Sequence, residues 1–236
     1  ETPDSVIDSP TNYEAESGNN GGNYPTLNPL HLGLSHNGGV NPQANLKYGN
    51  LKSDGNGAWA AAISTMPVPS SGKWYVEFVC LGGNTNIGLF KPVYHLDGTI
   101  RDSSTGESKA VWYGYDGVVR YYDSGNNVAS NSPDTYGSGD LIALAIDSDN
   151  NTVKYYKNNS LQYTQSLTQA LQNELAAGNL FPGVDTYAGV DCVVNFGASP
   201  FKFTPPSGYK SICTANLPAG SITKPSEYFD ALKYNG

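Results

Sequence analysis

The chain has 236 residues, among them 27 glycines, 15 prolines and 17 tyrosines, and only 14% of its residues are charged. This composition favours short strands joined by turns over helical bundles, which need alanine, leucine, glutamate and lysine in large amounts. A formal net charge of −8 argues against nucleic acid as a partner, because binding to phosphates requires clustered lysine and arginine.

Residues 1–45 differ in composition from the rest of the chain and are predicted to form an N-terminal arm or linker. Asparagine, glycine, serine and proline dominate there, and apolar residues occur singly. Such a segment cannot bury enough apolar surface to offset the entropy that it loses on ordering. Within it, residues 24–30 are expected to dock on the main body through Leu27 and Leu30.

From residue 46 onward, short apolar runs are separated by turn-forming residues, which predicts β-strands. Residues 73–80 alternate strictly, so Trp74, Val76 and Phe78 are expected on one face of a strand. Tyr75 and Glu77 are then expected on the opposite face. The other predicted strands are residues 46–52, 59–65, 86–90, 110–115, 118–122, 140–147, 152–157, 180–184 and 191–197.

Turn signals connect several of these strands. Asp116 and Gly117 predict a tight hairpin between residues 110–115 and 118–122, and the Asp/Asn-rich residues 148–151 predict another between 140–147 and 152–157. Residues 91–109 are predicted to form a long polar loop. Prolines interrupt the chain from residue 200 onward, and residues 228–232 suggest one more strand or the entry to a following domain.

One helix is predicted, over residues 164–177. Leu167, Leu171 and Leu175 recur there at helical spacing, and Gly178 is a stop signal. The three tryptophans, Trp59, Trp74 and Trp112, are expected in the core.

Cysteine usage and hydropathy indicate the compartment. Cys80, Cys192 and Cys213 make an odd number, which fits no closed disulfide framework, so all three are expected to be free thiols of a chain assembled in a reducing cytoplasm. Cys80 and Cys192 are expected to point inward as small core residues. No apolar run of about 18 residues predicts a membrane span, and no basic stretch followed by an apolar one predicts a signal peptide.

The residues predict no catalytic site, no metal site and no cofactor. A glycosidase needs two carboxylates across a cleft, whereas Glu77 is the only acid on its predicted strand. Residues 147–151 begin like a calcium loop but lack the glycine and glutamate that such a loop needs, so a hairpin turn is favoured. The histidines are too dispersed to form a metal set, being His31, His36 and His95.

Several motifs, in the same order, resemble the SPRY domain family. The strongest is residues 139–159 (GDLIALAIDSDNNTVKYYKNN), which resemble the central hairpin of that family. The remaining matches are residues 71–78 (SGKWYVEF), 86–89 (NIGL), 112–117 (WYGYDG), 180–182 (LFP) and 193–197 (VVNFG). The resemblance implies an all-β fold, an SPRY-like sandwich of two antiparallel sheets over residues 46–206, with an irregular N-terminal arm over 1–45, one short helix, and a Pro-rich C-terminal extension over 207–236.

The flanking segments resemble the framing of SPRY domains in tailed-bacteriophage virion proteins. These segments are residues 8–13 (DSPTNY), 24–30 (YPTLNPL), 205–210 (PPSGYK), 213–218 (CTANLP) and 228–230 (YFD). The resemblance implies a non-enzymatic virion component, a fibre, spike or surface appendage, assembled in the host cytoplasm and exposed outside the cell. Its partners would be other virion proteins and a host cell-surface glycan or protein, with no nucleic acid and no membrane insertion, and it would be multimeric on the particle. The alternative is a structural decoration, cement or docking protein of the capsid or tail.

Candidate ligand-binding residues are aromatic or polar residues of predicted loops and strand ends. They are Tyr94, His95 and Arg101 in the long loop, Tyr122 at a strand end, and Tyr163 before the predicted helix. Tyrosine combines a rigid stacking face with a hydroxyl group and therefore suits protein or sugar surfaces. The alternative is that Tyr122 is an ordinary sheet residue next to Tyr121.

Overall fold

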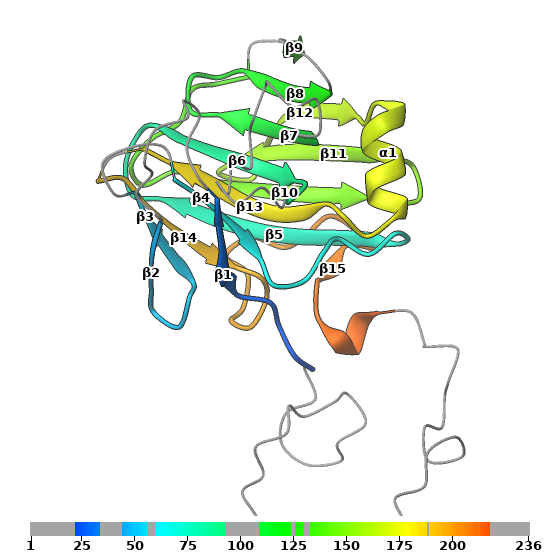
Figure 1. The fold of residues 1–236 in the computed structure, drawn as a ribbon, viewed down its shortest axis with the longest axis horizontal. Helices are drawn as coiled ribbons and strands as arrows, with labels where there is room; N and C mark the ends of the chain where they lie inside the picture. The colour runs from blue at the N-terminus through cyan, green and yellow to red at the C-terminus, as the bar shows by residue number, and fades with distance from the viewer. Residues whose placement is uncertain are drawn as a thin grey trace, which may run out of the picture.

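The computed structural model describes residues 22–33, 44–55, 60–92, 109–123, 126–129, 133–187 and 189–217, and gives only the backbone for residues 31–33, 122, 123 and 126–129. The described chain forms two β-sheets packed face to face, with helix α1 (Gln169–Ala176) across one end of the sandwich (Figure 1). This arrangement confirms the predicted all-β sandwich of two antiparallel sheets with a short helix.

The two sheets have the following strand orders. The seven-stranded sheet contains β1 (Leu27–Gly33), β4 (Ala60–Ser64), β13 (Phe181–Thr186), β6 (Thr85–Phe90), β7 (Lys109–Gly114), β8 (Val119–Asp123) and β9 (Asn126–Ala129). The eight-stranded sheet contains β12 (Ser160–Ser166), β11 (Thr152–Lys157), β10 (Leu141–Asp147), β5 (Lys73–Cys80), β14 (Asp191–Asn195), β3 (Lys52–Asp54) and β2 (Asn45–Lys47). Its eighth strand, β15 (Lys210–Ser211), pairs in parallel with β5, and a short 3-10 helix follows at Thr214–Asn216.

The main hydrophobic core lies between the two sheets. Trp74, Val76 and Phe78 of β5 are buried in it, which confirms the predicted alternation of this strand. Leu171 and Leu175 of α1 are buried in the same core, so the helix closes one end of the sandwich. Burying each large apolar side chain contributes about 1.5–3 kcal/mol, so this core is the main source of stability.

The predicted hairpin of β10 and β11 is confirmed. The two strands pair from Ile142↔Lys157 to Asp147↔Thr152, and Asn151 has a φ of 52° in the turn. The Asp147 carboxylate accepts hydrogen bonds from the backbone N–H of Asn150 at 3.1 Å and from its side-chain amide at 2.9 Å. Asp147 therefore stabilises a turn, as the hairpin interpretation predicted.

The prediction of one strand over residues 46–52 is wrong. The chain reverses there, and β2 and β3 form a short hairpin. Tyr48, Gly49 and Asn50 have φ values of 54°, 64° and 63°, and three consecutive left-handed residues cannot continue a strand. Leu46 and Leu51 pack against the core from either side of this turn. Both apolar residues are therefore part of the fold, but they lie on either side of a turn and not along a single strand.

The predicted helix over residues 164–177 is correct only in its second half. Residues up to Ser166 belong to β12, which pairs with β11 from Lys157↔Ser160 to Thr152↔Ser166. The helix starts after Thr168, whose side chain accepts a hydrogen bond from the Leu171 N–H as an N-cap. Its predicted end is confirmed, because Gly178 adopts a φ of 70°.

Both flanks of the chain pack against the sandwich. Leu27 is fully buried in the core, as predicted, whereas Leu30 is 93% exposed, so its predicted docking is wrong. Thr214 joins the flanks, because its hydroxyl accepts a hydrogen bond from the Asn23 N–H at 2.8 Å and its own N–H donates to the Asn23 carbonyl at 3.0 Å. Residues 22–26 and 213–216 consequently lie side by side (Figure 1).

The outer face of the eight-stranded sheet is covered by residues 200–209, which we call the C-terminal strap. Phe201, Phe203 and Tyr209 of the strap pack against a second apolar cluster around Tyr75, and the rings of Tyr75 and Phe201 are 4.9 Å apart at an interplanar angle of 85°. Tyr75 and Glu77 thus lie on the predicted face of β5 and are nevertheless buried.

The carboxylate of Glu77 anchors the strap. It is only 2% exposed and accepts hydrogen bonds from the backbone N–H groups of Lys202 at 2.8 Å and Phe203 at 3.0 Å. The Tyr75 hydroxyl donates a third bond to it at 3.2 Å. The only acid on this strand is therefore a structural acceptor.

Several predictions concern residues outside the described part of the chain. They are the loop conformation of residues 93–108, the environment of Trp59 and the strand suggested for residues 228–232. The division into an arm over 1–45, a sandwich over 46–206 and an extension over 207–236 stays a prediction, although β1 and β15 join the sheets from either side of the central segment.

Replacing Glu77 with alanine should destabilise the protein by about 3 kcal/mol, because two backbone N–H groups and a buried tyrosine hydroxyl lose a charged acceptor. Glu77→Gln keeps one acceptor oxygen and should lose less. Urea unfolding measures the difference, and limited proteolysis should show new cleavage within the strap. The exposed Asp134 provides the control, since Asp134→Asn should stay within about 0.5 kcal/mol of the parent protein. An equally small effect for Glu77→Ala would contradict the anchoring role.

Candidate functional site

The outer face of the seven-stranded sheet differs from the strapped face and is the candidate site. Its central part is apolar, and we call this set the apolar floor: Ala61, Ile63, Phe90, Ala110, Trp112 and Phe181. These residues come from β4, β6, β7 and β13 and form a cluster separate from the core between the sheets. All but Phe181, which is half-buried, are at most 5% exposed.

Glycines let Trp112 lie close to the sheet. The register places Gly183 opposite Gly88 and Gly88 opposite Trp112 on three adjacent strands. A Cβ atom added to Gly88 would lie 2.6 Å from the Trp112 Cβ and 2.1 Å from the Val111 carbonyl oxygen, so only glycine fits. Trp112 is buried as predicted, but on the outer face of the sheet, whereas Trp74 is in the core between the sheets.

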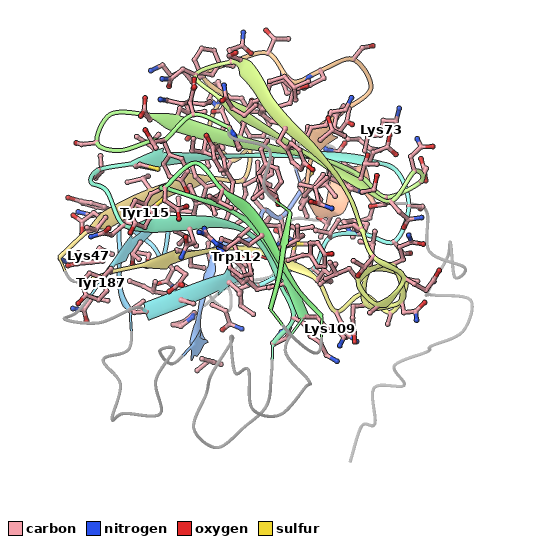
Figure 2. All side chains as sticks on the ribbon, turned by 90° about the horizontal axis from the view of Figure 1, so that it is seen from above. Lys47, Lys73, Lys109, Trp112, Tyr115 and Tyr187 are labelled. Atoms are coloured by element: carbon pink, nitrogen blue, oxygen red, sulfur yellow. The ribbon has the colours of Figure 1, made fainter. Side chains whose placement is uncertain are left out.

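The end of this face farther from α1 is polar. We call Asn86, Asp116, Arg120 and Asp185 the polar cluster. The Asn86 side-chain amide donates to the Asp185 carboxylate at 3.3 Å, and Arg120 donates from both terminal nitrogens to both oxygens of Asp116, one of these bonds measuring 2.8 Å. Figure 2 shows Tyr115 and Tyr187 toward this end of the sandwich and Lys109 toward the end that carries the helix.

A glycine brings the polar cluster together. A Cβ atom built on Gly114 would lie 2.6 Å from an Asp116 oxygen, 2.8 Å from an Arg120 nitrogen and 3.2 Å from the Asn86 oxygen. These polar groups therefore occupy the space that a side chain at position 114 would need. The hydrogen bonds from Arg120 hold the pKa of the Asp116 carboxyl below its ordinary value, so Asp116 is charged at neutral pH.

The four residues of the polar cluster differ in their exposure to solvent. Asn86 and Asp185 are 5% and 6% exposed, whereas the side chains of Arg120 and Asp116 are 29% and 35% exposed. A ligand approaching this end would thus meet a charged, bidentate ion pair first. Such a pair orders both side chains and offers hydrogen-bond donors and acceptors in fixed positions.

The predicted ligand-binding residues are only partly placed by the structure. Tyr94, His95 and Arg101 lie outside the described residues, and for Tyr122 only the backbone is described. The register places Tyr122 opposite Ala110, which in turn pairs with Phe90. The strand that follows the long loop is therefore next to Tyr122 on the seven-stranded sheet, and the strand that precedes the loop is one strand further away, at the end nearer to the helix.

Tyr163 does not belong to this group. It lies on β12 in the other sheet, opposite Tyr155, and packs half-buried against the core between the sheets. It was placed before a helix in the sequence because the strand β12 was not predicted. Its selection as a ligand-binding residue stays a prediction, but the fold separates it from Tyr122 and the long loop.

Sequence reasoning missed the polar cluster. Asp116 was recognised as a turn residue. A hairpin at Asp116–Gly117 places Arg120 within reach of Asp116, so this ion pair could have been predicted from the sequence. Asn86 and Asp185 are 99 residues apart, and only the pairing of β6 with β13 brings them together. No local pattern could have revealed their contact.

The buried acidic side chains of the described residues take part in structural contacts. No group of three or more histidine, cysteine, aspartate or glutamate residues in the described ranges could hold a metal ion. Glu77 and Asp147 are both engaged in structural hydrogen bonds.

No helix in the described part of the chain is long and apolar enough to cross a membrane.

Comparisons with known proteins agree with this architecture. Residues 73–199, more than half of the chain, match the family model of the SPRY domain. The crystal structure of the SPRY domain of human HERC1 aligns with a TM-score of 0.51 and 16% identity, covering 73% of this chain and 99% of that domain, which shows the shared fold.

A curated relative is the ATP-dependent RNA helicase Ddx1 of Drosophila melanogaster. The two sequences are 27% identical over an alignment of 175 residues. The alignment covers 71% of this chain but only 22% of the helicase. The likeness therefore concerns one part of that enzyme. SPRY domains are protein-interaction modules, and the match of the family model over the central hairpin and its neighbouring strands shows that this chain belongs to the SPRY domain family.

Proposed function

We propose that the chain is a non-enzymatic binding component of a tailed-bacteriophage particle. In this role it is a fibre, spike or surface appendage whose β-sandwich attaches to a protein or glycan on the host surface. Several copies act together on the particle, because weak single sites gain avidity when a symmetric assembly presents them side by side.

The asymmetry of the two outer faces carries the binding part of the proposal. The outer face of the eight-stranded sheet is covered by the C-terminal strap, which Glu77 anchors from beneath. The other outer face presents the exposed Arg120–Asp116 pair at one end, and at the other end the strands that lead into and out of the long loop. The apolar floor between these two ends is itself buried, so a partner is expected at the ends of this face and not on its centre.

The flanking motifs carry the phage part of the proposal. The two named relatives are animal proteins, so the phage assignment rests on the resemblance of residues 8–13, 24–30, 205–210, 213–218 and 228–230 to the framing of phage SPRY domains. Three of these segments take part in the folded unit, and in one of them Cys213 is buried. Leu27 is in the core, and Lys210 pairs with Trp74 in the strand register.

An alternative function is that of a structural decoration or docking protein of the capsid or tail. The hydrogen bonds between Asn23 and Thr214 favour it, because they hold the two ends of the described chain next to each other. Two neighbouring segments attached at one point could hold the domain to a particle.

Host binding is tested with the purified chain displayed on multivalent beads and incubated with host cells. The triple variant Tyr94→Ala, His95→Ala, Arg101→Ala should bind at least about tenfold more weakly, since truncating central aromatic or arginine residues commonly costs 1.4 kcal/mol or more, which is a factor of about ten. Leu161→Ala on the far sheet, where Leu161 is 50% exposed, is the matched control and should bind normally. Equal binding by all three proteins would exclude the loop, and no binding by any multivalent form would contradict attachment itself.

The docking alternative is tested by removing residues 1–21 and measuring incorporation into particles. The truncation ends before Gly22, because Leu27 is fully buried and the earlier boundary keeps the sandwich intact. Loss of incorporation with unchanged thermal unfolding and unchanged host binding would support docking through the arm. Normal incorporation would leave attachment as the better supported role, and labelling intact particles with antibody against residues 46–206 then locates the chain.

A further inference from the structure

Two of the three cysteines face each other across neighbouring strands. Cys80 ends β5 and Cys192 lies near the start of β14, and the register of these antiparallel strands pairs one directly with the other. Both side chains are free thiols and both are buried, with exposures of 0% and 1%. Their expected inward orientation is confirmed, but their direct pairing could not be deduced from positions 112 residues apart in the sequence.

The backbone hydrogen bonds define the kind of pair. The N–H of Leu81 donates to the carbonyl of Asp191 at 2.9 Å, so the bond joins the residues next to the cysteines and not the cysteines themselves. In a non-hydrogen-bonded pair the Cα atoms are about 4.5 Å apart. The side chains are closer than in the hydrogen-bonded pairs that alternate with it along the two strands. Disulfides need Cα atoms roughly 4.4–6.8 Å apart, so the pair lies at the short end of the permitted range.

We propose that Cys80 and Cys192 are the site of a cross-strand disulfide, which forms when the chain folds in the presence of a small-molecule disulfide such as oxidised glutathione. This proposal goes beyond the proposed function and does not depend on it. Cys213 is the third, unpaired thiol, and its sulfur accepts a contact from the Ser211 hydroxyl at 3.8 Å.

The burial of the two cysteines explains why the disulfide would form while the chain folds and not after folding is complete. Burial raises the pKa of the Cys192 thiol, and the neighbouring Cys80 raises it further, so Cys192 in the folded protein contains little thiolate. The thiolate is the nucleophile in exchange with disulfides, and buried cysteines are therefore inert. On its far side β14 is flanked only by the three-residue strands β3 and β2, so opening this sheet edge is the shortest route of access.

The reaction is thiol–disulfide exchange in two steps. The thiolate of one cysteine attacks a sulfur of oxidised glutathione, which forms a mixed disulfide and releases one glutathione thiolate. The thiolate of the second cysteine then attacks the protein-bound sulfur of that mixed disulfide and releases the second glutathione. Two protons and two electrons pass from the protein thiols to glutathione, and β5 becomes linked covalently to β14.

The test is refolding in glutathione buffers followed by a count of free thiols. The unfolded, reduced chain is refolded with either reduced glutathione alone or a mixture rich in oxidised glutathione, then denatured and treated with a maleimide. Trypsin places the three cysteines in different peptides, residues 74–101, 158–202 and 211–233, so a linked pair is identified by mass. The oxidised protein should also melt roughly 5–10 °C higher, because the bond closes a long loop.

The thiol count distinguishes the outcomes. Oxidative refolding should leave one reactive thiol in the parent protein and none in Cys213→Ser, with residues 74–101 linked to residues 158–202. Cys192→Ala should keep two thiols, and if that variant fails to fold, the linked peptide and the Cys213→Ser count remain decisive. Three reactive thiols after oxidative refolding, or a link to residues 211–233, would overturn the proposal.

Discussion

Strand β5 is buried on both faces and paired along both edges, and the rest of the sandwich is arranged around it. Its inward residues form the centre of the main core, and its outward residues Tyr75 and Glu77 lie beneath the C-terminal strap. One edge pairs with β10 over the whole strand, while the other pairs first with β15 and then with β14. A buried carboxylate is stable only with hydrogen-bond donors around it. Glu77 therefore requires the strap, and the strap in turn completes the outer layer of this sheet.

This requirement makes the two outer faces unequal. On the eight-stranded sheet the chain itself covers the apolar surface, because Phe201 and Phe203 pack where a partner would otherwise bind. On the seven-stranded sheet three glycines on adjacent strands let neighbouring groups lie close to the backbone: Gly88, Gly114 and Gly183. Trp112 and the polar cluster fill the space that side chains at two of these positions would need. In the proposed binding role, recognition is thus expected at the charged end of this sheet, where Asp116 and Arg120 are accessible, and where the long loop begins.

The sequence predicted the elements whose signals are local. β5 and the β10–β11 hairpin were placed correctly, because strict alternation and an Asp/Asn turn specify them within about twenty residues. The end of β12, residues 164–166, was mistaken for helix, since Leu167, Leu171 and Leu175 are all buried but only the last two lie in the helix. Pairing with β11 decides the structure up to Ser166, and such tertiary pairing overrides a local pattern. The contacts of Asn86 with Asp185 and of Cys80 with Cys192 depend on register alone, and no single-sequence pattern encodes them.

The positions of the flanks relative to the seven-stranded sheet bear on how the domain would be presented. β1 forms one edge of that sheet and β9 the other. Asn23, which contacts Thr214, lies shortly before β1, so the chain enters the sheet at the β1 edge. Tyr122 lies on β8, next to the β9 edge, and β7, the strand that follows the long loop, is the next strand inward. Attachment of the domain through its flanks would therefore hold it by the β1 edge and leave the opposite part of the same sheet turned outward. In the proposed appendage role, the β1 edge would hold the domain and the opposite part of the same sheet would meet the host.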